Sequence, residues 1–303
     1  MTPGGSPLRG RVVVVTGAAR GLGAALAHEV ARRGGTPALL GHEPALLAEV
    51  AARLPGPSLV HEVDITDAPG LRAAAEEVRR RLGRPSAVIA NAGVAEGGPF
   101  ATSDPAEWRR VIEVNLVGSA QTARAFLPDL VVTAGYYLQI ASLASMGAAP
   151  MMSAYCASKA GVEAFTHSLR AEVAHRGVGV GIAYLNWMDT EMIRDADRHA
   201  VLRELRGHMP PPARRTYRAD DVAARVVRGL ERRRTAIYAP AWLRLVQPVR
   251  AALPPVVLRL SRRELPRLEE REPLLHTGLL GAGGDADRAA AGAGAGAGGR
   301  EDG

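Results

Sequence analysis

A tyrosine and a lysine stand four residues apart in the stretch Tyr155-Cys156-Ala157-Ser158-Lys159. Residues 153–175 show the apolar spacing of a helix, on which such positions share one face. Lys159 is the only lysine among 38 basic residues, which indicates a need for a flexible ammonium that arginine does not meet. We expect this ammonium to lower the pKa of the Tyr155 phenol from about 10, as a general acid or base requires. Such pairs also occur on ordinary helix surfaces, so other motifs must decide.

A glycine-rich stretch near the N-terminus is the second motif, Thr16-Gly17-Ala18-Ala19-Arg20-Gly21-Leu22-Gly23. Residues 11–15 predict a strand buried on both faces, and residues 22–31 predict a helix. Glycines between a strand and a helix let backbone N–H groups approach a pyrophosphate at the helix N-terminus. The stretch therefore predicts a dinucleotide site.

The glycines at 17, 21 and 23, taken with Tyr155 and Lys159, resemble the classical short-chain dehydrogenase/reductase family over residues 8–240. The resemblance implies an α/β fold, a Rossmann-like doubly wound parallel sheet in a single domain. It also implies four catalytic residues, Asn115, Ser142, Tyr155 and Lys159. Ser142 lies thirteen residues before Tyr155, as in the family, and Ser145 is the alternative hydroxyl.

Each of these four residues has a role by resemblance. Ser142 orients the substrate oxygen and Tyr155 transfers the proton. Lys159 holds the nicotinamide ribose, while Asn115 holds a helix kink and completes a proton relay. The alternative for Asn115 is a core amide with all its hydrogen bonds made.

The resemblance further implies a cofactor site along the carboxyl ends of the strands. Its residues are Thr16, Gly17, Arg20, Gly21, Leu22, Gly23, His42, Glu43, Asp64, Ile65, Asn91, Ala92, Gly93, Tyr155, Lys159 and Thr190. His42 replaces the aspartate that suggests NAD in the family. Glu43 would repel the 2′-phosphate of NADP, whereas Arg20 would attract it. The cofactor is therefore predicted as NAD(P)(H), with a lean towards NAD(H).

One stretch departs from the family pattern. Leu185-Asn186 stands where a Pro-Gly turn is expected, and Asn186 is predicted to adopt the left-handed conformation in place of glycine. Trp187 and Met188 either line the substrate side or pack in the core. Residues 192–207 are predicted to form a helical substrate lid.

Composition narrows the class of protein. The chain has 303 residues, of which 47% are hydrophobic and 23% charged, which is typical of one large domain with appendages. Its net charge of +7 comes from scattered arginines, so nucleic acid is not expected as a partner. The lone Cys156 excludes an internal disulfide, and no metal site is predicted. Neither a signal peptide nor a membrane-length apolar run is evident, so we predict a cytoplasmic protein.

The ends of the chain lie outside the resemblance. Residues 1–10 form an N-terminal arm. In residues 241–280 the prolines at 248, 254 and 255 are predicted to break the chain into short helices. Apolar residues mixed with arginine suggest packing or covering of the cleft, ranked above contact with an anionic membrane surface. The Gly/Ala-rich residues 281–303 are predicted to be disordered.

Together these features predict an NAD(P)-dependent oxidoreductase that interconverts a carbonyl and a secondary alcohol on an apolar small molecule. The resemblance implies a homodimer or homotetramer. Two alternatives remain: a non-catalytic dinucleotide-binding regulatory protein, and a peripheral membrane protein that acts through residues 241–260.

Overall fold

Seven parallel strands form the centre of the protein in the computed structural model, which describes residues 5–288. The strand order is β3-β2-β1-β4-β5-β6-β7, and it reverses between β1 and β4, where such sheets open a crevice for ligands. The strands are β1 Val12–Thr16, β2 Thr36–Gly41, β3 Leu59–Glu62, β4 Ala87–Ala90, β5 Tyr136–Ser142, β6 Gly179–Leu185 and β7 Ala236–Ala239. The predicted doubly wound α/β fold is confirmed.

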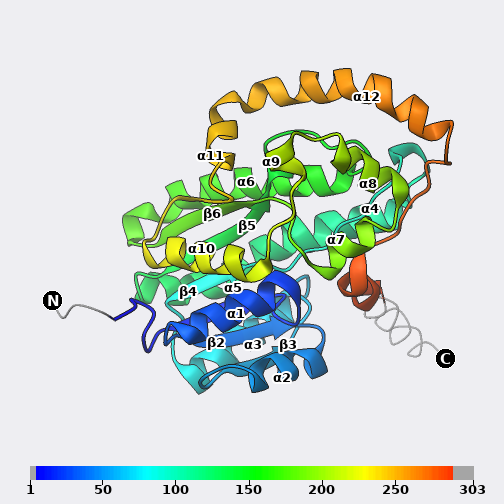
Figure 1. Cartoon of the computed structure of the whole chain (residues 1–303). Helices are drawn as coiled ribbons and strands as arrows, with labels where there is room; N and C mark the ends of the chain where they lie inside the picture. Colours follow the sequence, from blue (N-terminus) through cyan, green and yellow to red (C-terminus); the bar gives the residue numbers. More distant parts are fainter. Residues whose placement is uncertain (1–4, 289–303) are drawn as a thin grey trace, which may run out of the picture.

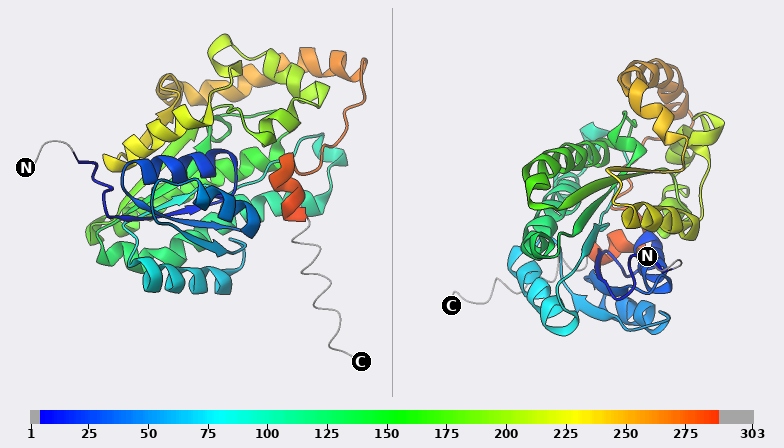
Figure 2. Two further views of the ribbon diagram at one scale, coloured as in Figure 1. Left: turned by 60° about the horizontal axis from the view of Figure 1, so that its bottom comes forward. Right: turned by 90° about the vertical axis from the view of Figure 1, so that its left-hand side faces the viewer.

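Helices cover both faces of the sheet, which explains why β1 and β4 are fully buried and apolar at every position except Thr16, the last residue of β1. Figure 2 shows the two helical layers. One face carries α1 Gly21–Arg32, α2 Pro44–Ala52 and α10 Ala219–Glu231. The other carries α3 Ala68–Leu82, α4 Pro105–Ile112, α5 Ser119–Val132 and α6 Ser153–Val173.

The remaining helices lie above the carboxyl ends of β5 and β6 (Figure 1). The lid predicted over residues 192–207 consists of α7 Glu191–Ala196 and α8 Ala200–Gly207, followed by α9 Pro211–Arg214. After β7 come α11 Leu243–Val246, a 3-10 turn over Gln247–Ala252, and α12 Leu253–Glu269.

Helix α12 corrects the prediction that prolines divide residues 241–280 into short pieces. Pro254 and Pro255 lie in the first turn of a 17-residue helix. The first backbone N–H groups of a helix have no partner within it, so prolines are tolerated there. Only Pro248 lies in a short turn, at the start of residues Gln247–Ala252.

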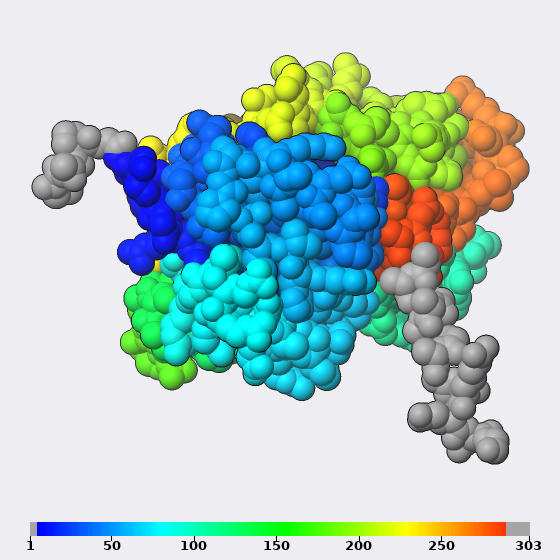
Figure 3. All heavy atoms as spheres, turned by 90° about the horizontal axis from the view of Figure 1, so that it is seen from below, coloured from blue at the N-terminus to red at the C-terminus, as the bar shows by residue number. Residues whose placement is uncertain are grey.

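Residues 276–288, here called the C-terminal strap, return to the body of the protein. The prediction of disorder from residue 281 is wrong for residues 281–288, which are helical. They are ordered because Leu280 is buried and Asp287 is buried against Arg110. Figure 3 shows this orange-red segment packed against the blue N-terminal half. The rest of the predicted tail, and residues 1–4 of the arm, lie outside the described residues.

Candidate functional site

The glycine-rich turn between β1 and α1 needs its glycines. Gly17 and Gly21 have φ of +63° and +53°, a region that other residues rarely adopt. A β-carbon on Gly23 would lie 1.9 Å from the carbonyl oxygen of Gly17. The turn therefore packs closely against the start of α1, and no side chains at these glycines separate its backbone from the crevice.

Thr16 and Asn91 join the two strands on either side of this crevice. The Thr16 hydroxyl accepts hydrogen bonds from the backbone N–H groups of Asn91 and Ala92, at 3.0 and 3.1 Å. The Asn91 side-chain amide donates to the Thr16 carbonyl at 3.0 Å. Both residues thus shape the floor of the site through the backbone.

At the other end of the site, α6 presents Tyr155 and Lys159 towards the end of β5, where Ser142 lies. The Lys159 ammonium is 5.5 Å from the centre of the Tyr155 ring. Burial raises the pKa of Tyr155 to about 12, although a hydrogen bond with Ser142 acts in the opposite direction. Burial also lowers the pKa of Lys159 to about 8.

These pKa values correct the prediction that the ammonium lowers the pKa of the phenol. Desolvation disfavours the charged forms of both buried groups, and the Lys159 ammonium is not among the groups that lower the pKa of the phenol. Tyr155 is therefore protonated at neutral pH, in the form that can donate a proton.

Asn115 lies in a π-helical turn, Glu113–Gly118, between α4 and α5. Its side chain is completely buried and makes hydrogen bonds to both backbone groups of Val94, at 2.8 and 2.9 Å, and to the Ser158 hydroxyl at 2.9 Å. The helix irregularity expected at this residue is present. Asn115 ties the loop after β4 to α6, through the residue next to Lys159.

Charged side chains surround the predicted adenosine end of the site. The Arg20 guanidinium donates to the carboxylates of Glu43 and Glu191, so the residue expected to attract a 2′-phosphate is already paired. The ring Nε2 of His42 is buried and has no hydrogen-bond partner. Burial raises the pKa of Asp64, but hydrogen bonds from Thr66 and Arg110 outweigh it, so the net pKa is lowered.

One cavity of about 730 Å³ brings these groups together. All the predicted catalytic and cofactor residues line it except Thr16 and Asn115, which act from behind the first layer of side chains. The predicted tyrosine, lysine, serine and glycine motifs thus meet in one place.

The substrate side of the cavity is mostly apolar. Lid and α12 residues line it, namely Leu202, Leu205, Met209, Leu253, Val256, Val257 and Leu260. The sequence predicted a lid over residues 192–207 and favoured packing or covering of the cleft for the segment after β7, but it did not single out these side chains as lining residues. The spacing of Leu253, Val257 and Leu260 along one helical face is the signal that could have found three of them. Trp187 and Met188 line the cavity, as one of the predicted alternatives had it.

The turn after β6 differs from its prediction. Asn186 does not adopt a positive φ. Its side-chain amide donates to the carbonyls of Ala213 and Arg215, at 3.0 and 3.3 Å. The asparagine therefore holds the chain between α9 and α10 by hydrogen bonds. The alternative hydroxyl, Ser145, is occupied by a hydrogen bond to the Ser142 carbonyl at 2.7 Å.

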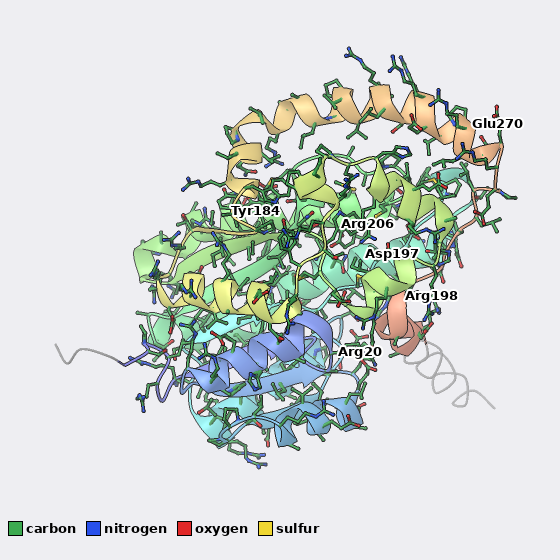
Figure 4. All side chains as sticks on the ribbon, viewed as in Figure 1. Arg20, Tyr184, Asp197, Arg198, Arg206 and Glu270 are labelled. Atoms are coloured by element: carbon green, nitrogen blue, oxygen red, sulfur yellow. The ribbon has the colours of Figure 1, made fainter. Side chains whose placement is uncertain are left out.

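The lid is fixed over this end by Arg206. Its guanidinium donates to Asp197 at 2.6 Å and lies over the Trp187 ring, 5.8 Å from the ring centre. Figure 4 labels Asp197 and Arg206 on the lid helices, with Arg20 lower down beside the strap.

A cluster that spacing does not reveal is formed by Glu96, Glu107 and His276, whose ligand atoms lie within 4.8 Å of one another. No metal site was predicted, because these residues are far apart in the sequence. His276 is 3.0 Å from the Glu96 carboxylate and 3.5 Å from that of Glu107. In this structure the cluster fastens the strap to α4 and to the loop after β4.

A parallel sheet with a glycine-rich turn at its crevice defines a dinucleotide-binding α/β protein. Comparison with known families narrows this class: the short chain dehydrogenase model matches residues 11–200. The chain belongs to the short-chain dehydrogenase family.

Individual relatives agree with this placement. The chain is 31% identical over 235 residues to a probable oxidoreductase, EphD, of Mycobacterium tuberculosis, covering 74% of this chain and only 40% of the relative. It is also 31% identical over 226 residues to a 3-oxoacyl-(acyl-carrier-protein) reductase, FabG, of Pseudomonas aeruginosa, covering 71% and 88% of the two chains. Among solved structures, a short chain dehydrogenase/reductase from Burkholderia phymatum in complex with NAD is similar, with a TM-score of 0.71 and 27% identity. That match covers 79% of this chain and 92% of the other.

Proposed function

We propose that the protein is an NAD(P)-dependent oxidoreductase that interconverts a carbonyl and a secondary alcohol. The observation that carries the proposal is the meeting of Ser142, Tyr155 and Lys159 in the same cavity as the glycine-rich turn.

The residues present fit a nicotinamide dinucleotide. The glycine turn leaves no room for side chains, as the contact of a Gly23 β-carbon with the Gly17 carbonyl demonstrates. Lys159 lies at the catalytic end of the same cavity, and Glu43 and Asp64 lie along its other end. The bound nicotinamide would supply or accept the hydride.

The protein's own groups handle the proton. Ser142 would hold the substrate oxygen with its hydroxyl, next to Tyr155. In reduction, the protonated Tyr155 donates its phenolic proton to that oxygen. In alcohol oxidation Tyr155 must start as the phenolate and accept the proton of the alcohol, which returns it to the phenol; the Lys159 ammonium would stabilise the phenolate before the transfer. Asn115 would contribute to a proton relay through its place beside Lys159.

The proposal favours NAD(H) over NADP(H). Glu43 and Glu191 both hold Arg20, so a 2′-phosphate would meet carboxylates and a guanidinium that is already paired. The proposed substrate is an apolar ketone or alcohol, because apolar side chains of the lid and α12 line the cavity beyond Tyr155. Homodimer or homotetramer assembly and cytoplasmic location stay predictions. No helix within residues 5–288 is long and apolar enough to cross a bilayer.

The test is consumption of NADH and NADPH by purified protein with a panel of ketones and aldehydes, followed by absorbance. Replacing Tyr155 with Phe removes only the transferable proton, so we expect cofactor binding to persist while turnover falls by about 100-fold or more. Turnover of the Tyr155→Phe variant equal to that of the wild type would refute the mechanism.

A further inference from the structure

We propose that the C-terminal strap forms the outer wall of the adenosine end of the nucleotide groove, and that a nucleotide enters or leaves only after the strap detaches. This inference rests on the proposed function, since it takes the occupant of the groove to be a nicotinamide dinucleotide.

The strap is bound first to the catalytic side of the groove. The backbone N–H of Thr277 donates to the Gly97 carbonyl, and that of Leu280 to the Ala95 carbonyl, each at 2.8 Å. Leu280 is 1% exposed and packs in the apolar cluster that includes Tyr155. The first part of the strap thus pairs, in extended conformation, with the loop after β4.

The strap next contacts the lid and the glycine-rich turn. The backbone N–H of Gly281 donates to the Asp195 carboxylate of α7 at 2.7 Å. A β-carbon on Gly283 would lie 3.8 Å from Cδ of Arg20, which places the strap helix directly beside the turn between β1 and α1. Leu280, Gly283 and Asp287 all line the same cavity as the glycine turn.

The far end of the strap is fastened by one buried ion pair. Arg110 of α4 donates two hydrogen bonds to the Asp287 carboxylate, both at 2.8 Å, and a third to Asp64 at 2.7 Å. Asp287 is only 2% exposed. The hydrogen bonds to Asp287 raise the pKa of Arg110, so the guanidinium is charged throughout the physiological range. Without the charge of Asp287, the Arg110 guanidinium would keep its pair with Asp64 but lose two charged hydrogen bonds.

These contacts run along the groove from the catalytic loop, past Arg20, to Asp64. Asp64 and Glu43 are the residues predicted to face the adenosine, so the strap encloses that part of the site. Detachment of the strap would then control nucleotide exchange, as lids and loops do in many enzymes. The position of Asp287 at the end of the strap makes its pair with Arg110 the contact that holds the adenosine end of the strap.

The experiment measures release of NADH by stopped-flow fluorescence, after the complex of protein and NADH is mixed with excess NAD⁺, which is not fluorescent. Asp287→Asn keeps the size of the side chain and removes the charge of the fastening. We expect NADH release to be about 10-fold faster or more, which is the effect of losing a charged hydrogen bond. Asp285→Asn is the matched control, because Asp285 lies on the same helical turn with its side chain 69% exposed, and within residues 5–288 its one ion pair is with Arg288.

Two results would overturn the inference. One is release from the Asp287→Asn variant at the wild-type rate. The other comes from hydrogen exchange of the wild-type protein with and without NADH. We expect the backbone amides of Leu280 and Gly281 to exchange more slowly when NADH is bound. Equal exchange rates with and without NADH would show that the strap does not enclose the nucleotide. If the wild type binds neither NADH nor NADPH in equilibrium titration, the proposed function itself fails.

Discussion

At the scale of single residues, the burial of Lys159 in the site lowers the free energy of unfolding of the protein. It is 5% exposed, and burial lowers its pKa from 10.5 to about 8. Below pH 8 the amine is charged in both the folded and the unfolded chain, so the folded protein bears the full desolvation penalty. Between pH 8 and 10.5 the folded protein releases its proton before the unfolded chain does. The free energy of unfolding attributable to Lys159 therefore rises with pH across this window.

Replacing Lys159 with Met should consequently stabilise the protein while it abolishes turnover. We expect the gain in free energy of unfolding to be larger at pH 7 than at pH 10.5 by about 3 kcal/mol, from the difference between the two pKa values. Urea unfolding across this pH range, without nucleotide, measures it. Arg72→Met, at an exposed position of α3, is the control and should show no such pH dependence. A gain for Lys159→Met that does not change with pH would contradict the burial argument.

At the scale of elements, the turn between β1 and α1 depends on close packing of backbone against backbone. In the Gly23→Ala variant the new methyl group would meet the Gly17 carbonyl, so the turn must open. We expect a loss of about 1–3 kcal/mol in stability and a loss of about 10-fold or more in NADH affinity. Urea unfolding and fluorescence titration measure the two effects. Gly56→Ala is the control, since its β-carbon would meet nothing within 4 Å; an equal loss there would point to a general effect of alanine.

The elements of the central sheet and its site residues could be predicted because their signals are local. Gly17 follows the apolar strand β1 and Ser142 ends the apolar strand β5, whereas Tyr155 lies in the first turn of helix α6, whose apolar spacing predicts it. The pKa of Tyr155 could not be predicted, since its burial depends on segments that meet only in the fold. Asn186 was predicted to have a backbone role because its hydrogen-bond partners at the end of α9, Ala213 and Arg215, are distant in the sequence. The order of residues 281–288 escaped prediction for the same reason: Arg110 and Asp287 are 177 residues apart.

At the scale of the whole molecule, residues beyond the sheet supply two separate covers for one cavity. Residues of helix α12 and of the C-terminal strap both line it, and the proposed substrate side lies under α12 and the proposed adenosine end under the strap. Figure 1 shows the two segments well apart, α12 at the top and the strap at the lower right. Both follow β7 and lie outside residues 11–200, which the family model matches. Since the covers contact different parts of the site, we expect each to control a different step: α12 the binding of the apolar substrate, and the strap the exchange of the nucleotide.

Substitutions in the two covers should therefore act independently. Val257→Asn places a polar amide in the apolar wall formed by α12, so we expect KM for the best ketone of the panel to rise about 10-fold with NADH release unchanged. Val249→Asn, at a residue 57% exposed and away from the cavity wall, is the control. In the double variant of Val257→Asn and Asp287→Asn, the effects on KM and on the rate of NADH release should be additive within about 0.5 kcal/mol. Steady-state kinetics and stopped-flow release measure both quantities on the wild type, the two single variants and the double variant. A change in NADH release caused by Val257→Asn alone would mean that α12 and the strap move together as one cover.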